Sequence, residues 1–257
     1  MTPAEIEAAA EKAGRAKAAL PPGRAFMRAM LAGFLIGLGG MFMLIVKSDA
    51  ALSFAPSALL GGLCFSVGLF AVLVAGAELF TGNNLMVLGC LRGAYAPSQL
   101  VRSWVIVYAG NLAGSLVLAA ILLVADFAGM NGGAVGEAAV AVATAKTSLP
   151  FATVCFRGIM CNFLVCLAVW ISFAGTSVVD KLIAAALPVT AFVACGFEHC
   201  VANMFFLPFG MALSGGTVAP DAALMNIVAA TLGNIVGGAL LFAGAYWLAY
   251  GAKDADR

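Results

Sequence analysis

Charged residues are scarce in this sequence. Only 10% of its 257 residues are Asp, Glu, Lys or Arg, whereas 63% are apolar, and the mean hydropathy is +1.07. This composition excludes an ordinary soluble domain. The formal net charge is +1, and the basic residues flank apolar runs, so no basic face is available for nucleic acid. The composition therefore predicts an all-α membrane protein.

Several motifs of enzymes and of other transporters are also missing. A single histidine excludes the H-E-x-x-H motif and most polyhistidine metal sites, and no G-x-S-x-G occurs. We therefore predict no catalytic residue, metal or cofactor, and a membrane-embedded enzyme is the remote alternative. The absence of any Asn-Pro dipeptide argues against the nearer alternative, a neutral-solute facilitator of the aquaporin type. The seven cysteines have no C-x-x-C spacing and are interpreted as packing residues.

Long apolar runs are abundant, and six of them can cross a bilayer. They are Phe26 to Val46, Ser57 to Cys90, Leu100 to Val124, Phe151 to Phe173, Leu182 to Met211, and Asn226 to Tyr250. The second and fifth far exceed the roughly 20 residues that span about 30 Å. Each of these two is therefore expected to be tilted or broken near its middle.

The basic residues indicate the orientation of the chain. Most of the 13 Lys and Arg residues fall on the side of the two termini: Lys12, Arg15, Lys17, Arg24, Arg28, Arg92, Arg102, Lys181, Lys253 and Arg257. The opposite side holds Lys47, Lys146 and Arg157. The positive-inside rule then predicts a multi-pass protein of the cytoplasmic (inner) membrane with both termini in the cytoplasm.

The first 24 residues are predicted to form a cytoplasmic surface helix rather than a signal peptide, because acidic residues precede any apolar run. Thr2 and Glu5 have capping-box spacing with Pro3 at the first helical position, and Pro21-Pro22-Gly23 would end the helix.

The sequence contains an internal repeat. Glu78 precedes Asn83 by the same interval at which Glu198 precedes Asn203, and both pairs lie in the overlong spans. Gly110-Asn111-x-x-Gly114 in the third span is likewise repeated as Gly233-Asn234-x-x-Gly237 in the sixth. Three spans per copy is an odd number, so the second copy must run in the opposite sense. We predict one transmembrane domain (1–257) with inverted repeats at 25–124 and 151–250.

The repeat motifs also predict where the long helices break. Gly and Asn tolerate non-helical backbone, so we expect the interruptions at 81–84 and 200–203. The G-x-x-x-G pairs, including one at Gly33 and Gly37, are expected to permit close helix packing.

Glu198 and His199 place ionisable groups in the middle of an apolar run. Such groups cost roughly 2.5–3.5 kcal/mol at the centre of a spanning helix and usually mark a functional path. Adjacent residues on a helix point about 100° apart, so we assign His199 to the path and Glu198 to hydrogen bonding at the helix break. Because histidine changes charge near neutral pH, His199 is a candidate to hand a proton or a hydrogen bond to a dehydrated anion. A structural core histidine is the competing interpretation.

At this point the sequence resembles the formate/nitrite transporter family. The matching segments are 77–83 (AELFTGN), 107–115 (VYAGNLAGS), 161–170 (CNFLVCLAVW), 196–204 (GFEHCVANM) and 231–238 (TLGNIVGG). The resemblance implies six spans in an aquaporin-like fold, with a pore in each protomer of a homopentamer in lipid. It also implies passive or proton-coupled transport of a small monovalent anion, with formate favoured over nitrite or hydrosulfide.

The resemblance also implies roles for individual residues. The substrate path would contain His199, Thr81, Lys146 and Asn162. Glu78, Glu198, Asn83, Asn203, Asn111 and Asn234 would support the path. Hydrophobic constrictions would lie at Leu79, Phe80 and Val165 on one side of the histidine and at Phe65 and Phe192 on the other. An ordinary flanking lysine at 146 and a hydroxyl that only satisfies backbone at Thr81 remain the alternatives.

Overall fold

The computed structural model describes residues 1–251, so Lys253 and Arg257 lie outside the described residues. No strand occurs within that range. Five helical segments are long and apolar enough to cross a membrane by length and composition. They are α2 (Pro22–Lys47), α3 (Phe54–Ala75), α5 (Pro97–Val124), α7 (Phe151–Ala174) and a continuous segment, Pro220–Tyr250. This last segment comprises α10 (Pro220–Ile235), a π-helical stretch (Val236–Ala243), α11 (Gly244–Tyr246) and the start of a second π-helical stretch (Trp247–Gly251).

Shorter elements complete the described chain. They are α1 (Pro3–Ala18), the 3₁₀ helix η1 (Gly82–Met86), α4 (Val87–Leu91), the 3₁₀ segment η2 (Phe127–Gly133), α6 (Ala134–Thr147), α8 (Val178–Ala194) and α9 (Cys200–Leu213). The predicted spans coincide with these helices to within a few residues at most ends. Helix α6 was not predicted, because its alanine-rich sequence has no membrane-length apolar run.

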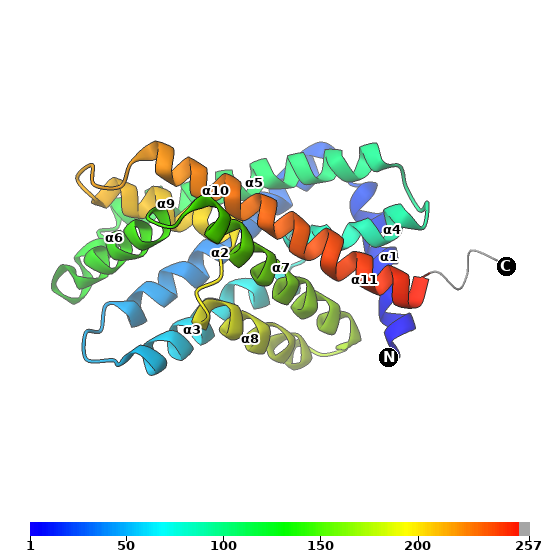
Figure 1. Ribbon diagram of the computed structural model, residues 1–257, viewed down its shortest axis with the longest axis horizontal. Coiled ribbons are helices and arrows are strands. Elements are labelled where there is room, and N and C mark those ends of the chain that lie inside the picture. Colours follow the sequence, from blue (N-terminus) through cyan, green and yellow to red (C-terminus); the bar gives the residue numbers. More distant parts are fainter. Residues whose placement is uncertain (252–257) are drawn as a thin grey trace.

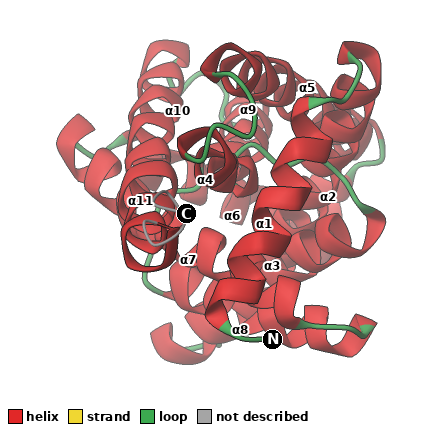
Figure 2. Ribbon diagram, turned by 90° about the vertical axis from the view of Figure 1, so that its right-hand side faces the viewer, coloured by secondary structure: helices red, strands yellow, loops and turns green. Residues whose placement is uncertain are grey.

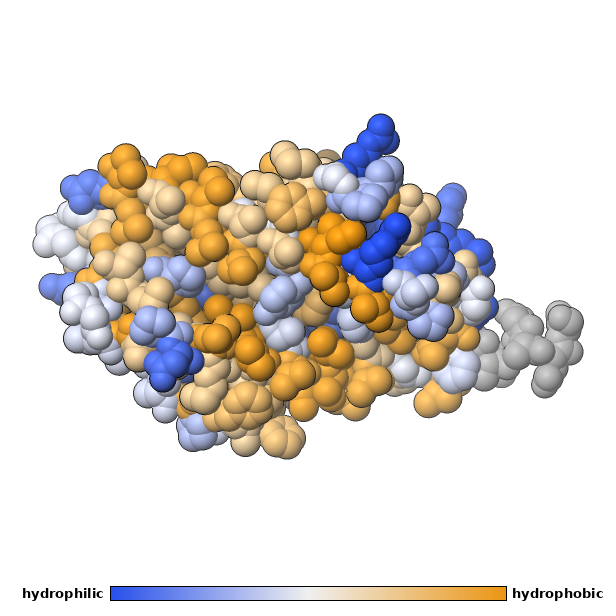
Figure 3. All heavy atoms as spheres, turned by 90° about the horizontal axis from the view of Figure 1, so that it is seen from above, coloured by the Kyte–Doolittle hydropathy of each residue, from blue (hydrophilic) through white to orange (hydrophobic). Residues whose placement is uncertain are grey.

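The long helices run roughly side by side along the longest axis of the molecule (Figure 1). The connection from α2 to α3 lies at the left end with α6, and the connection from α7 to α8 lies at the right end near α1. Helix α1 crosses that right end (Figure 2). Hydrophobic atoms cover much of the face in Figure 3, and the most hydrophilic atoms gather toward the end with α1. This distribution fits a bundle with its long axis across the bilayer.

Glycines permit two very close helix pairs. A Cβ on Gly114 would overlap the carbonyl oxygen of Met30, so α2 and α5 meet backbone to backbone. A Cβ on Gly237 would overlap the carbonyl oxygen of Ile159 in the same way between α7 and the last helical segment. The close-packing role predicted for the G-x-x-x-G pairs is therefore confirmed.

Both overlong spans are interrupted, but the predicted positions of the breaks are wrong. Non-helical backbone separates α3 from η1 and α8 from α9, and it begins at Gly76 (φ +66°) and near Gly196 (φ +67°). These left-handed conformations suit glycine and end the preceding helix. Residues 82–84 instead start η1, and residues 200–203 form the first turn of α9.

Helix α1 has the predicted capping box. The Thr2 hydroxyl accepts from the Glu5 N–H at 3.3 Å, and the Glu5 carboxylate accepts from the Thr2 N–H at 2.6 Å. The backbone N–H of Thr2 lowers the pKa of the Glu5 carboxyl. Farther along, Arg92 pairs with Glu7 at 2.9 Å and fastens α1 to the end of α4.

Candidate functional site

Two asparagines from neighbouring helices hold the interrupted segments. The Asn234 amide donates to the carbonyls of Gly158 and Glu198 at 2.9 Å each, and its oxygen accepts from the Cys200 N–H at 2.9 Å. In the other half, the Asn111 amide donates to the carbonyls of Ala29 and Glu78 at 2.8 and 2.9 Å, and its oxygen accepts from the Phe80 N–H at 2.9 Å. The backbone groups freed by each break are thus satisfied from the adjacent long helix.

Each break also carries a buried carboxylate with an amide and a lysine. Glu198 Oε2 accepts from Asn203 Nδ2 at 2.7 Å and from Lys146 Nζ at 3.0 Å. The Glu198 carboxylate therefore bonds an asparagine in the first turn of α9 and a lysine of α6.

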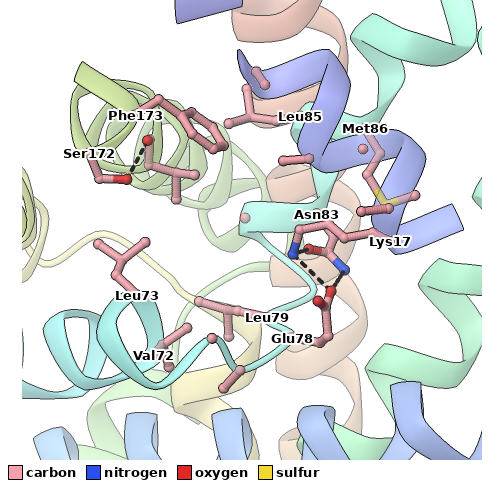
Figure 4. Close-up of a pocket in the computed structure, with 18 of the residues that line it drawn as sticks. Lys17, Val72, Leu73, Glu78, Leu79, Asn83, Leu85, Met86, Ser172 and Phe173 are labelled. Carbon is pink, nitrogen blue, oxygen red and sulfur yellow. Dashed lines mark hydrogen bonds and ion pairs between the residues drawn. The ribbon is translucent and has the colours of Figure 1, made fainter. Parts of the chain in front are cut away.

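The first half repeats this cluster with a lysine that the sequence analysis missed. Glu78 Oε2 accepts from Asn83 Nδ2 and from Lys17 Nζ, each at 2.8 Å (Figure 4). Lys17 was counted only as a flanking charge. The signal that could have identified it is its position ahead of the first repeat, as Lys146 stands ahead of the second.

His199 lies at the start of α9, opposite Thr81. The histidine Nε2 and the threonine Oγ1 are 2.9 Å apart, and both residues are buried. His199 is also the N-cap of α9, where its Nδ1 accepts from the Ala202 N–H at 3.1 Å. This pair joins the two interrupted segments directly, although 118 residues separate them in sequence.

The two bonds fix the protonation state of the ring in this arrangement. Because Nδ1 accepts a hydrogen bond, the proton of a neutral His199 must lie on Nε2, which then donates to Thr81 Oγ1. The hydroxyl proton of Thr81 is left available for another acceptor. A second ring proton, on Nδ1, would break the bond to Ala202, so a titrating His199 would have to change its contacts.

Two cavities approach this pair. A cavity of about 640 Å³ is lined by residues that include Lys17, Glu78 and Leu79. Figure 4 shows the Lys17 side chain directed from α1 toward Glu78 and Asn83. A second cavity, of about 270 Å³, is lined by residues that include Lys146, Glu198 and His199. Leu79 and Gly82, which flank the buried Thr81, line the larger cavity, and His199 lines the smaller one. The Thr81–His199 bond therefore joins the walls of the two cavities.

The aromatic residues predicted as one constriction pack beside His199. The Phe192 ring stacks on the histidine with centroids 5.9 Å apart, and Phe65 meets Phe192 edge-on at 5.9 Å. Phe206, which the sequence analysis did not single out, stacks on Phe65 at 6.2 Å and lines the smaller cavity with Phe192.

The residues predicted for the opposite constriction divide into different environments. Leu79 lines the larger cavity. Phe80 packs edge-on against Trp104 and Tyr108, at 6.0 and 5.0 Å. Val165 is buried in the same apolar cluster as Leu79 and Phe80.

Asn162 is fully buried, and its amide links three elements. Its Nδ2 donates to Asn84 Oδ1 at 3.1 Å and to the Asn234 carbonyl at 2.7 Å. Both amide protons are used in these bonds, which link η1, α7 and α10. The Oδ1 oxygen of Asn162 also receives a weak contact from the Cys166 thiol.

Within residues 1–251, no group of three His, Cys, Asp or Glu side chains is placed to hold a metal ion. The seven cysteines are free thiols, mostly inside the helices. The arrangement offers hydrogen-bond donors and cations to a small anion.

Comparison with known proteins gives the family. The family model described as "Formate/nitrite transporter" matches residues 4–248. The chain is 34% identical over 269 residues to the formate channel FocA of Escherichia coli (strain K12), covering 97% of this chain and 94% of that protein.

Two solved structures share the fold. A "Pentameric formate channel with formate bound" has a TM-score of 0.78 and 36% identity, covering 89% of this chain and 97% of the other. An "FNT family ion channel" has a TM-score of 0.87 and 27% identity, covering 95% and 98%. The match runs through both cavities and the residues between them, and this chain belongs to the formate/nitrite transporter family.

Proposed function

We propose that this protein carries a small monovalent anion across the membrane through a path in each protomer, with formate the first candidate and nitrite and hydrosulfide next. The observation that carries the proposal is the Thr81–His199 bond between two cavities that each contain cationic side chains. The similarity to a formate channel and to a structure titled with bound formate supports formate as substrate.

The path must compensate an anion for the water it loses. Burying an unpaired charge is prohibitive, so an anion that passes Leu79 and Phe192 needs donors at the narrowest point. Neutral His199 donates to Thr81, and Thr81 turns its own hydroxyl proton toward the anion. The N-terminus of α9, which begins next to His199, adds a favourable positive potential at the same place.

The proton in proton-coupled transport enters with the substrate. When Nδ1 accepts from the Ala202 N–H, the only ring N–H proton of neutral His199 is on Nε2. Release of that proton would leave a negatively charged ring. The anion therefore crosses hydrogen-bonded to Thr81 or as the neutral acid protonated in a cavity, and His199 acts as a fixed donor in both cases.

The same proposal includes the architecture. Residues 25–124 and 151–250 form inverted repeats of one transmembrane domain, in which α3 with η1 and α4, and α8 with α9, act as the second and fifth of six crossings. The matched contacts of Asn111 and Asn234 support this pairing. Five copies assemble in the inner membrane with both termini cytoplasmic, in keeping with the pentameric relative and the distribution of basic residues.

Reconstituted protein tests the function. Uptake into proteoliposomes is measured for formate, nitrite, hydrosulfide and the neutral solutes water and glycerol, with internal pH recorded. Wild type should take up formate, and Thr81→Val should lower the rate about tenfold or more, because a hydrogen bond to a charged partner contributes about 1.5–3 kcal/mol. Thr81→Ser keeps the hydroxyl and should retain most activity.

Two results would contradict the proposed function or the role of Thr81 in it. Rapid water or glycerol permeation with no anion uptake would favour the neutral-solute facilitator. Equal formate rates for Thr81→Val and wild type would show that the threonine hydroxyl only satisfies local structure.

A further inference from the structure

One lysine at each cavity is already paired with a carboxylate. Lys146 Nζ lies 3.0 Å from Glu198, and Lys17 Nζ lies 2.8 Å from Glu78. Each of these ion pairs is buried at its carboxylate and has no net formal charge. An anion approaching from solution is therefore attracted mainly by whatever cationic side chains remain unpaired at each cavity.

Arg157 and Arg28 are such side chains, and they occupy equivalent places in the two halves. The Arg157 carbonyl accepts from the Glu198 N–H at 3.4 Å, and the Arg28 carbonyl accepts from the Glu78 N–H at 3.1 Å. The next residue along each helix, Gly158 or Ala29, is bound through its carbonyl by Asn234 or Asn111. Each arginine thus stands directly before an anchored residue, at the edge of one interrupted segment.

Each arginine is among the residues that line a cavity, and neither has a carboxylate partner among the described residues. Arg157 lines the smaller cavity and Arg28 the larger. In the described part of the chain, neither forms an ion pair. Arg157 Nη1 donates to the Gly196 carbonyl at 3.3 Å, which leaves most of its five N–H donors free.

We propose that Arg157 at one mouth and Arg28 at the other are docking sites for a planar anion with two oxygens, such as formate or nitrite. This inference rests on the proposed transport function. The guanidinium fork presents two parallel N–H groups that match two oxygens of one anion. Hydrosulfide has a single heavy atom, so it gains the charge attraction but not the paired hydrogen bonds. The arginines therefore favour oxyanions before these reach Thr81 and His199.

Lys47 provides a matched control at the same cavity. It also lines the smaller cavity, and it has no carboxylate partner among the described residues. Its Nζ is 3.4 Å from the Ser57 hydroxyl. Loss of Lys47 removes the same charge as loss of Arg157, but it removes no guanidinium group with paired N–H donors.

The experiment measures the half-saturation concentration of formate, nitrite and hydrosulfide uptake in proteoliposomes at low and high salt. Arg157→Gln should raise it about two- to fivefold for all three anions at low salt, and less at high salt, because exposed charges are screened. Arg157→Lys should raise it for formate and nitrite but leave hydrosulfide near the wild-type value. Lys47→Gln should shift all three anions equally.

The membrane face from which the anion is supplied distinguishes the effects of the two arginines. Arg28→Gln, which breaks no bond to an interrupted segment, should raise the half-saturation from one membrane face only, and Arg157→Gln from the other. Intact cells and inverted vesicles expose the two faces in turn.

Two results would overturn the inference while the proposed function stands: unchanged half-saturation in Arg157→Gln and Arg28→Gln, or an equal effect of Arg157→Lys on formate and hydrosulfide. If wild type moves no anion, the proposed function fails first. A lower maximal rate with unchanged half-saturation would assign Arg157 to holding Gly196 only.

Discussion

His199 is the residue on which the proposed path depends, and its two nitrogens make different hydrogen bonds. Nδ1 caps α9, and Nε2 bonds Thr81. The first bond is structural, and in the proposed function the second lies at the substrate path. The two interpretations left open by the sequence, a path histidine and a core histidine, therefore describe the two nitrogens of one ring.

Substituting His199 separates the effects of these two bonds. Asparagine is a preferred N-cap, so His199→Asn should keep the Ala202 bond and the stability of the protein, while its shorter side chain loses Thr81. Formate flux should fall, and the shape of its pH profile should stay that of wild type, because a neutral donor adds no titration. His199→Ala should also lose about 0.5–2 kcal/mol of stability with the cap.

The measurements are proteoliposome flux between about pH 5 and 8, the range in which an ordinary histidine changes charge, and thermal unfolding in detergent. A flattened pH profile in a well-folded His199→Asn protein would mean that the ring gains and loses a proton during transport.

Single residues could be predicted from the sequence only where the repeat or the motif made them visible. Glu78, Glu198 and His199 stand out because ionisable groups are rare in apolar runs. Lys17 and Arg28 were read as ordinary flanking charges, because nothing in a linear sequence shows that they turn inward onto a cavity. That placement depends on α1 crossing the end of the bundle (Figure 2).

At the scale of elements, excess length in two spans correctly indicated interrupted helices, but composition misplaced the breaks. The Gly-Asn run at 82–84 suggested irregular backbone, yet those residues start a 3₁₀ helix. Left-handed backbone at Gly76 ends α3 instead, and an amide from a different helix, Asn111, satisfies the freed groups. Local sequence composition does not show the contribution of this third helix, so it could not locate the break.

Close helix contacts give a prediction at this scale. Gly237→Ala places a Cβ against the Ile159 carbonyl, and overpacking of this kind costs about 1–3 kcal/mol. We expect a lower unfolding temperature, measured by intrinsic fluorescence in detergent. Gly23→Ala, where no atom lies within 4 Å of the added Cβ, is the control and should unfold like wild type. Equal unfolding temperatures for both variants would show that the last helical segment, Pro220–Tyr250, moves away from α7 without cost.

The whole molecule joins two similar halves around the Thr81–His199 bond. Each half contributes one glutamate, one asparagine at the interruption and one lysine from outside the repeat. One of the contacts between the two interrupted segments is an unlike pair, a threonine from one half and a histidine from the other. In the proposed function, the Glu, Asn and Lys residues common to both halves hold the interrupted segments in place, and the Thr81–His199 pair supplies the hydrogen-bond donor to the anion. The sequence predicted this pairing of halves, because the Glu and Asn intervals repeat, but not the two cavities that it creates.

The proposed inverted arrangement of the halves predicts where equivalent positions lie. Ser53 precedes α3 and Thr176 lies just before α8, and both side chains are exposed. Ser53 makes no side-chain hydrogen bond to α3, and the Thr176 hydroxyl bonds the exposed Asp180 carboxylate at the surface, so Ser53→Cys and Thr176→Cys should fold normally. Inverted repeats place these equivalent residues on opposite faces of the membrane, whereas parallel repeats would place them on the same face.

A membrane-impermeant maleimide distinguishes these arrangements. In intact cells it should label Ser53→Cys and not Thr176→Cys, and in inverted vesicles the pattern should reverse, because both termini are proposed to be cytoplasmic. Peptide mass spectrometry locates the label, and wild type, with its seven native cysteines, reports the background. The reverse pattern would keep the inverted repeat and reverse the orientation. Labelling of both variants from one face alone would exclude the inversion, and with it the equivalence of Arg28 and Arg157 at opposite mouths.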